Sequence, residues 1–202
     1  MVPGFREIPE WSRSAIAAYG VRVDRLKRVA RHARDGHTGA FDALVEATYP
    51  QVWRFCAGIL GHQSADDFAQ ETYVRVFRAL PGYRGESSPQ TWMLGIARHV
   101  CVDEIRARYR RDQGERTAGA GERFQPDCAD QVANNELVAS LETDKRTAFV
   151  LTQLLGMSYE ESARVCECPV GTIRSRVARA RADLIALYSG ADSPEEFHAR
   201  TA

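Results

Sequence analysis

The segment after Pro169 carries side chains whose types and spacing suit contact with DNA. Arginine presents its N–H donors in a planar fork, which can bind a guanine edge or a phosphate through two hydrogen bonds. The candidate contacts are Thr172, Arg174, Ser175, Arg176 and Arg179. Small residues at Gly171, Ala178 and Ala182 would let a helix here approach a groove closely.

Local signals place these residues on the second helix of a helix-turn-helix. Ser158 and Glu161 have the spacing of a capping box, and Gly156 suits the end of the preceding helix. Glu167-Cys168 fits a tight turn, and Pro169 fits a first helical position. The apolar residues that follow recur at intervals of four and three, as on one buried helix face: Ile173, Val177, Ala180, Leu184 and Leu187. Charged helix faces are often merely solvated, but these signals together favour DNA binding.

The basic charge of the chain is concentrated in two patches. The 202 residues include 27 basic and 27 acidic side chains, so the net charge is zero, which alone argues against nucleic acid. Five arginines lie between Arg98 and Arg111 against two acidic residues, and five lie between Arg164 and Arg181 against one. This uneven distribution favours a nucleic-acid partner that is contacted at two places.

Chemistry other than binding has little support in the sequence. The five cysteines have irregular spacing, which argues against a disulfide framework and predicts reduced thiols: Cys56, Cys101, Cys128, Cys166 and Cys168. One residue separates Cys166 from Cys168, whereas zinc ligands are usually about two to four residues apart. A thiol enzyme or metal protein that uses this pair is an alternative without an accompanying base or ligand set. No catalytic residue, metal or cofactor is predicted.

Helical periodicity runs through the chain and no stretch alternates like a β-strand, so the predicted fold is all-α. The expected helices cover residues 22–34, 38–60, 64–80, 89–110, 134–141, 144–155, 158–166 and 169–188. Between the expected helices 89–110 and 134–141, a glycine-containing stretch of dispersed charge predicts a flexible linker. We expect two small helical domains, the C-terminal one containing the helix-turn-helix. The predicted boundaries are an N-terminal extension at 1–21, a domain at 22–111, a linker at 112–133, a domain at 134–188 and a tail at 189–202.

A second surface is predicted on the helix that follows Ser64. Ser64 and Asp67 have capping-box spacing. The expected core stripe consists of Ala69, Tyr73, Val76, Phe77 and Leu80. The outward residues are Asp67, Glu71, Val74, Arg75 and Arg78, with Phe68 near the same side. An exposed aromatic ring among charges suggests a protein-docking surface.

Three strings now resemble a known family. DDFAQETYVRVFRALPGY, TWMLGIARHVCVDEIRARYRR and LLGMSYEESARVCECPVGTIRSRVARARADL resemble bacterial sigma factors of the extracytoplasmic-function class, most closely the actinobacterial C-type members. The resemblance covers about residues 21 to 188 in the order of the family. It implies a protein that binds core RNA polymerase through the β′ clamp and β flap and directs transcription initiation at promoter DNA. An anti-sigma factor is a further partner that the resemblance implies for many members.

The resemblance also implies a role for each predicted surface. Polymerase binding would involve Asp66, Asp67, Phe68, Gln70, Glu71 and Arg75. Recognition and melting of the −10 element would involve Glu86, Ser87, Ser88, Gln90, Trp92, Arg98, His99, Asp103, Arg106 and Arg110. Recognition of the −35 element would involve Thr172, Arg174, Ser175, Arg176 and Arg179. Trp92 is expected in the core more than against a base. His99 is as compatible with a plain surface position as with DNA contact.

One alternative of another class keeps the helix-turn-helix. A stand-alone transcriptional regulator would pair it with an N-terminal sensor domain and bind a palindrome as a dimer, but the N-terminal half shows an acidic docking helix instead. No apolar run reaches the roughly 18 residues of a membrane span, and the N-terminus lacks the pattern of a secretion signal. The expected location is therefore the cytoplasm, without membrane insertion.

Overall fold

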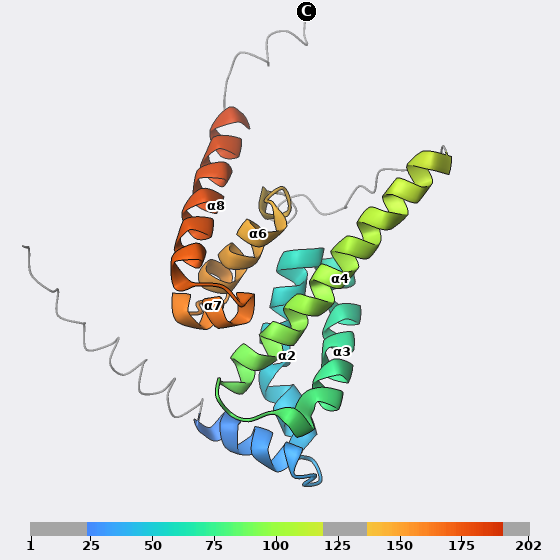
Figure 1. Ribbon diagram of the computed structural model, residues 1–202, viewed down its shortest axis with the longest axis vertical. Coiled ribbons are helices and arrows are strands. Elements are labelled where there is room, and N and C mark those ends of the chain that lie inside the picture. The colour runs from blue at the N-terminus through green and yellow to red at the C-terminus, as the bar shows by residue number, and fades with distance from the viewer. Residues whose placement is uncertain (1–23, 119–136, 192–202) are drawn as a thin grey trace, which may run out of the picture.

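The computed structural model describes residues 24–118 and 137–191 (Figure 1). The predicted extension, Cys128, part of the predicted linker and most of the predicted tail lie outside these residues. The described residues form helices and no strand, as the all-α prediction requires, and none of the helices is long and apolar enough to cross a membrane. A helix covers residues 24–34, followed by α2 (Ala40–Leu60), α3 (His62–Ala79), η1 (Leu80–Gly82), α4 (Pro89–Ala118), α6 (Thr143–Phe149), η2 (Val150–Leu154), α7 (Tyr159–Cys166) and α8 (Val170–Ala191).

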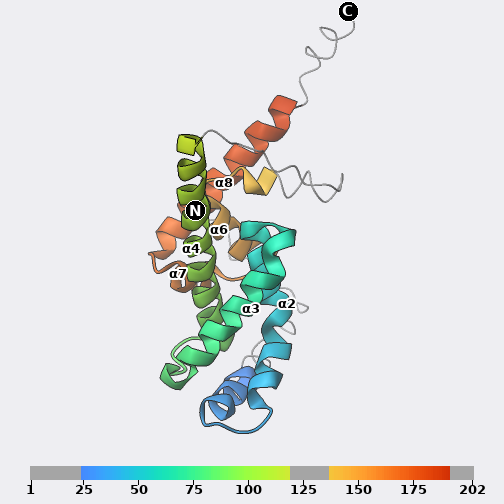
Figure 2. The ribbon, with the colours of Figure 1, turned by 90° about the vertical axis from the view of Figure 1, so that its right-hand side faces the viewer.

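Helix α2 is the centre of the first unit, where it packs against both α3 and α4 (Figures 1 and 2). Leu44, Val52 and Phe55 of α2 are fully buried, as are Met93 and Leu94 of α4. Burial of each such apolar side chain contributes about 1.5–3 kcal/mol relative to exposure. The periodic apolar residues of three helices therefore provide the core that holds the predicted −10 and polymerase surfaces in place.

Helices α2 and α3 meet at the single residue Gly61. Its φ of 91° lies in a region that glycine adopts without strain, and its N–H donates to the carbonyl of Ala57 at 3.0 Å. Consequently α3 begins at His62, and Ser64 lies inside its first turn rather than at its cap. The predicted capping box of Ser64 and Asp67 is therefore wrong, because glycine conformation ends one helix and starts the next.

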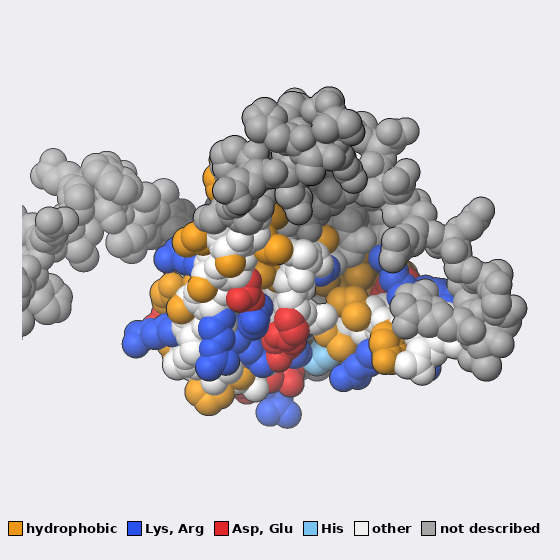
Figure 3. Space-filling view, turned by 90° about the horizontal axis from the view of Figure 1, so that it is seen from above, with side chains coloured by type: hydrophobic (Ala, Val, Ile, Leu, Met, Phe, Trp, Pro, Cys, Tyr) orange, Lys and Arg blue, Asp and Glu red, His pale blue; other side chains and the backbone are white. Residues whose placement is uncertain are grey.

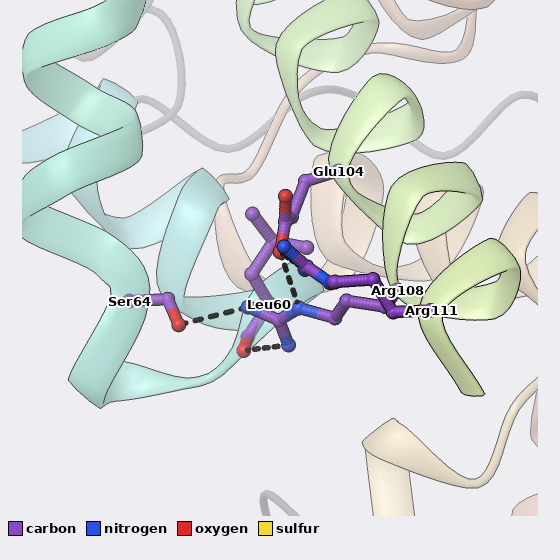
Figure 4. Close-up of polar contacts among 5 residues, drawn as sticks. All are labelled: Leu60, Ser64, Glu104, Arg108 and Arg111. Atoms are coloured by element: carbon purple, nitrogen blue, oxygen red, sulfur yellow. Dashed lines mark hydrogen bonds and ion pairs between the residues drawn. The ribbon is translucent and has the colours of Figure 1, made fainter. Parts of the chain in front are cut away.

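Glu104 of α4 organises a polar cluster beside this corner (Figure 4). The Nε of Arg108 donates to Glu104 Oε1 at 2.8 Å, and Arg111 Nη2 donates to the same oxygen at 2.8 Å. Arg108 Nη2 also donates to Ser64 Oγ at 2.9 Å, and its Nη1 reaches the carbonyl of Leu60 at 3.5 Å. One guanidinium thus ties α4 to the end of α2 and the start of α3.

The second unit consists of α6, η2, α7 and α8. Ser158 and Glu161 form the predicted capping box, in which Ser158 Oγ accepts from the Glu161 N–H at 3.1 Å and Glu161 Oε2 accepts from the Ser158 N–H at 3.1 Å. Glu167, with a φ of 54°, makes the predicted tight turn. Helix α8 begins at Val170, so Pro169 directly precedes the helix instead of occupying its first position.

Two predicted core stripes extend too far. Phe77 of α3 is 61% exposed and packs edge-on against Phe41, with ring centroids 5.2 Å apart, whereas Phe68 is half-buried against the core. Both rings flank the true stripe, and tertiary packing decided which one faces water. On α8, Ile173 is buried as predicted, but Leu187 is 45% exposed. Helix α4 also continues past the predicted residue 110 to Ala118.

Replacing Glu104 with Gln is expected to lower the free energy of unfolding by about 1–2 kcal/mol, because the charge-assisted hydrogen bonds from its two arginines are weakened. The loss is no larger because those arginines are partly exposed to solvent. Burial opposes ionisation of Glu104, but the hydrogen bonds from Arg108 and Arg111 outweigh it and lower its pKa. The stabilisation is present above the ordinary carboxyl pKa of about 4.3 and is lost as the pH falls through the lower folded-state value. Urea unfolding at several pH values measures both effects.

The matched control is Glu86→Gln, because Glu86 is exposed and lies 3.9 Å from Arg84. Between roughly pH 5 and pH 3, the wild type should lose more stability than the Glu104→Gln variant. Equal effects of the two substitutions at neutral pH would show that the polar cluster does not hold the corner.

Candidate nucleic-acid and protein interfaces

The predicted −35 face of α8 is largely open to solvent. Arg174, Ser175 and Arg179 are exposed, and Thr172 is half-buried. Ile173, Val177 and Ala180 are buried on the opposite side, which fixes the orientation of the helix. In the described part of the chain, neither Arg174 nor Arg179 lies within ion-pair distance of a carboxylate. Both guanidinium groups are therefore available to an anionic ligand.

Arg176 differs from its neighbours because the fold already uses it. Its Nη2 donates to Asp144 Oδ2, and its Nη1 approaches Cys168 Sγ at 3.7 Å. This pairing joins α8 to α6, and the Arg176 side chain is only 23% exposed. Contact between Arg176 and DNA would require the guanidinium to leave Asp144. The structure thus gives Arg176 a structural role that the sequence did not indicate.

The arginines of α4 divide in the same way. Arg108 and Arg111 bind Glu104, whereas Arg106 and Arg110 are exposed. The predicted −10 contacts include the second pair and omit the first. Arg98 is half-buried and His99 is exposed. The solvent-facing side of α4 therefore presents positive charge at Arg106 and Arg110, about 25–30 Å along the helix from its start at Pro89.

The loop over residues 83–88 is held by its own aromatic and hydroxyl groups. The Tyr83 hydroxyl donates to the carbonyl of Ser87 at 2.7 Å, and the Tyr83 ring lies 4.9 Å from the half-buried ring of Trp92. Ser88 is buried, and its Oγ accepts from the Thr91 N–H at 3.0 Å at the start of α4. Its hydroxyl thus serves as a helix cap. Glu86 remains exposed at the loop tip.

The predicted polymerase face of α3 contains both free and engaged groups. Asp67 and Gln70 are exposed, while Asp66 accepts a hydrogen bond from the Tyr49 hydroxyl at 2.9 Å. Arg75 donates to Glu71 at 2.8 Å and to Asp103 of α4 at 2.8 Å. These contacts raise the pKa of Arg75, with Asp103 as the larger cause. Arg75 therefore links the predicted polymerase face to the predicted −10 face.

The two units pack against each other. A Cβ on Gly58 of α2 would lie 3.0 Å from both methyl carbons of Val150, so any larger residue would require Val150 to shift by a few tenths of an ångström or more. Arg146 of α6 donates through Nη1 to the carbonyl of Ile59 at 2.9 Å, and burial lowers its pKa. Buried residues of both units form one continuous apolar cluster. The two predicted domains therefore share one core in this structure, which is called the packed form.

This packing covers part of the predicted −10 face. Helix α7 packs against α4, and Glu167 Oε1 lies 3.7 Å from His99 Nε2. The end of the molecule viewed in Figure 3 shows basic and acidic side chains side by side rather than one unbroken basic face. The two predicted DNA-reading helices thus belong to a packed form whose −10 face is partly occupied by the protein itself.

Tyr83, Gly58 and Arg146 are site and interface residues that sequence reasoning missed. Tyr83 follows the Pro81-Gly82 pair, which reads as a plain helix break. Gly58 lies in the interior of a helix, where a glycine signals a close neighbour but does not identify it. Arg146 and Ile59 are 87 residues apart, so no local pattern could pair them.

The described cysteines are largely withdrawn from solvent. Cys56, Cys101 and Cys166 are buried, and Cys168 is half-buried. Burial raises the pKa of Cys166 to about 12, which disfavours the nucleophilic thiolate at neutral pH. In the described residues, no three His, Cys, Asp or Glu side chains gather as a metal site requires.

Two family models match the chain in succession. Sigma-70 region 2 matches residues 44–111, and Sigma-70, region 4 matches residues 135–184. The "ECF RNA polymerase sigma factor SigC" of Mycobacterium tuberculosis is 47% identical over 170 residues, which cover 81% of this chain and 91% of that protein. The "RNA polymerase sigma-H factor" of Pseudomonas aeruginosa is 34% identical over 176 residues, covering 79% and 88%.

Solved structures with the same arrangement of helices support these matches. The complex of CnrH with the cytosolic domain of CnrY gives a TM-score of 0.66 at 26% identity, covering 83% of this chain and 98% of that chain. The sigma factor RpoE, in complex with the anti-sigma factor NepR from Bartonella quintana, gives a TM-score of 0.64 at 27% identity, covering 75% and 98%.

Replacing Gly58 with Leu is expected to open the packed form, because the new side chain would overlap Val150. Small-angle X-ray scattering should then report a larger radius of gyration than for the wild type. Gly171→Leu is the matched control, since a Cβ at Gly171 meets nothing within 4 Å. An unchanged radius for Gly58→Leu, with folded helices confirmed by circular dichroism, would mean that this contact does not hold the units together.

Proposed function

The chain belongs to the sigma-70 family, in the extracytoplasmic-function class of RNA polymerase sigma factors, and on this premise we propose how its surfaces divide the work of promoter recognition. The observation that carries the function is the succession of regions 2 and 4 in one chain. The sigma factor binds core RNA polymerase and promoter DNA, and it directs transcription initiation.

Core polymerase binds the exposed acidic side of α3, according to the proposal. Asp67 and Gln70 are exposed and available to it. The carboxylates of Asp66 and Glu71 each accept a hydrogen bond from one neighbouring side chain. Phe68 is half-buried, so the exposed apolar contact on this helix comes from Val74 and Phe77. Charged groups around an apolar centre are typical of protein interfaces.

The −10 element is proposed to bind the 83–88 loop and α4. Bases must leave the DNA stack to be read there, which costs a few kcal/mol, and nearby positive charge offsets part of this cost. Arg106 and Arg110 supply positive charge for the strand further along α4, while Glu86 and Ser87 belong to the loop and Gln90 follows it. Trp92 supports the loop by packing against Tyr83. Ser88 acts through the cap of α4 and is not proposed as a direct contact.

The −35 element is proposed to bind α8. Arg174, Ser175 and Arg179 are the direct contacts because they are exposed. Thr172 flanks them, and Arg176 orients α8 from its ion pair with Asp144. The domain boundaries proposed from the sequence, 22–111 and 134–188, place the two DNA-reading surfaces on different domains.

Polymerase binding must separate the two packed units before both elements can be read together. The contact between Glu167 and His99 places the turn of the helix-turn-helix against α4, where the −10 strand would lie. The free sigma factor is therefore proposed to bind DNA weakly. Once the polymerase fixes both domains, the second DNA contact becomes intramolecular and its effective concentration rises.

The stand-alone regulator is not favoured, because sigma-70 region 2 fills the half of the chain where a sensor domain would lie. The sigma factor is proposed to catalyse no bond change, since the polymerase performs RNA synthesis. Its proposed location is the cytoplasm, where bacterial polymerase and promoter DNA are found. An anti-sigma factor is also proposed as a partner, by analogy with the RpoE complex.

Asp67→Arg is expected to weaken binding to core polymerase by at least about tenfold, because a like-charge contact at an interface costs several kcal/mol. Asp67 is exposed and makes no ion pair within the described residues, so the substitution breaks no ion pair of the fold, and circular dichroism checks that the variant is folded. Fluorescence anisotropy with labelled sigma factor measures the affinity, and run-off transcription measures the consequence. Unchanged polymerase affinity would move the docking surface away from α3.

Arg179→Ala is expected to leave polymerase affinity unchanged and to weaken discrimination at one −35 position by about 1–3 kcal/mol. Arg181→Ala is the control on the same helix, because Arg181 Nη2 is engaged by Gln153 at 2.6 Å. Run-off transcription from promoters with single −35 substitutions compares the two variants. Equal promoter selectivity in the two variants would exclude Arg179 as a base contact. Transcription that does not depend on this chain would refute the proposed function itself.

A further inference from the structure

The helix over residues 24–34 carries a row of basic side chains outside the two matched regions, the first of which begins at residue 44. Leu26 and Ala30 are buried in the core and set the inner face of the helix. At about 100° per residue, Lys27, Arg31 and Arg34 then lie on one flank, and Arg25 lies on the opposite flank. Lys27, Arg31 and Arg34 together form row 27–31–34.

Row 27–31–34 adjoins the loop proposed to open the promoter. Arg34 Nη1 donates to the carbonyl of Tyr83 at 3.4 Å. Burial raises the pKa of Tyr83, and the positive charge of Arg31 partly offsets this rise. Figures 1 and 2 show the helix beside the end of the molecule where α4 begins. The row is therefore continuous with the 83–88 loop.

The positive charge of the row is concentrated on two of its members. Arg34 forms an ion pair with Asp35 at 2.9 Å, so much of its charge is already balanced. Among the described residues, no carboxylate lies within ion-pair distance of Lys27 or Arg31. Arg31 is exposed and Lys27 is half-buried, and the Nε of Arg31 reaches the carbonyl of Lys27 at 3.4 Å. Arg34 thus positions the helix, and the other two can bind an anion.

We propose that Lys27 and Arg31 bind phosphates of the single DNA strand where it passes the 83–88 loop of the opened promoter. The inference rests on the proposed function, because it requires that strand to be present. Two cations one helical turn apart match the repeated charge of a nucleic-acid backbone. Arg31 lies one turn before Arg34, whose guanidinium contacts the loop at which strand separation is proposed to begin. The contact would add affinity for opened DNA without reading its sequence.

The test uses holoenzyme, made from core polymerase and the full-length sigma factor, and a promoter whose −10 region is held open by mismatches. Affinity is measured by fluorescence anisotropy over a range of salt concentrations. Arg31→Ala is expected to reduce the slope of log affinity against log salt by about 0.7, and Lys27→Ala with Arg31→Ala by about 1.4, as expected for single-stranded phosphates. Arg25→Ala, the same change on the opposite flank, should leave the slope unchanged.

A slope unchanged by Arg31→Ala, or reduced equally by Arg25→Ala, overturns the inference. Reduced affinity of the variants for core polymerase alone would show that the row docks on protein, which also overturns it. If the wild-type holoenzyme fails to bind the opened promoter, the proposed function fails first, so the two failures are distinguishable. Alanine favours helix at these positions, and circular dichroism confirms that the variants remain folded.

Discussion

The last turn of α2 leaves backbone carbonyls that its own helix cannot satisfy, and two arginines from different halves of the molecule bind them. Arg108 of α4 reaches the carbonyl of Leu60, and Arg146 of α6 donates to that of Ile59. Unpaired buried carbonyls are costly, and cations at a helix C-terminus gain about 0.3–1 kcal/mol from its dipole. The C-terminal end of α2 is therefore the point at which α3, α4 and the second unit are all held in place.

The two arginines differ in how completely their N–H groups are satisfied. Arg108 has Glu104, Ser64 and Leu60 as partners and lies within the first unit. Arg146 is more deeply buried, and its Nε is without a hydrogen-bond partner among the described residues. A buried, incompletely paired cation costs free energy. The contact between the units therefore includes a buried cation whose Nε would regain water if the units separated.

Signals confined to a few neighbouring residues could be predicted, and arrangements set by distant ones could not. The capping box at Ser158 and the turn at Glu167 are local, and both are confirmed. Ser64 had the same local pattern, but Gly61 ended the preceding helix first. Phe68 and Phe77 flank one stripe symmetrically, so periodicity alone could not decide which ring packs inward. The Gly58 contact joins residues far apart in sequence, which explains why the packed form was not foreseen.

The zero net charge of a DNA-binding chain follows from the division of its arginines. Arg75, Arg108, Arg111 and Arg176 each pair with a carboxylate, so acidic residues accompany the arginines that hold the fold. Arg106, Arg110, Arg174 and Arg179 are exposed, and none of the described carboxylates pairs with them. Counting all 27 basic residues thus overstates the charge that DNA can meet. Because the unpaired cations are divided between separate helices, each helix is proposed to bind DNA weakly, and a partner that fixes them on one promoter makes their contributions multiply.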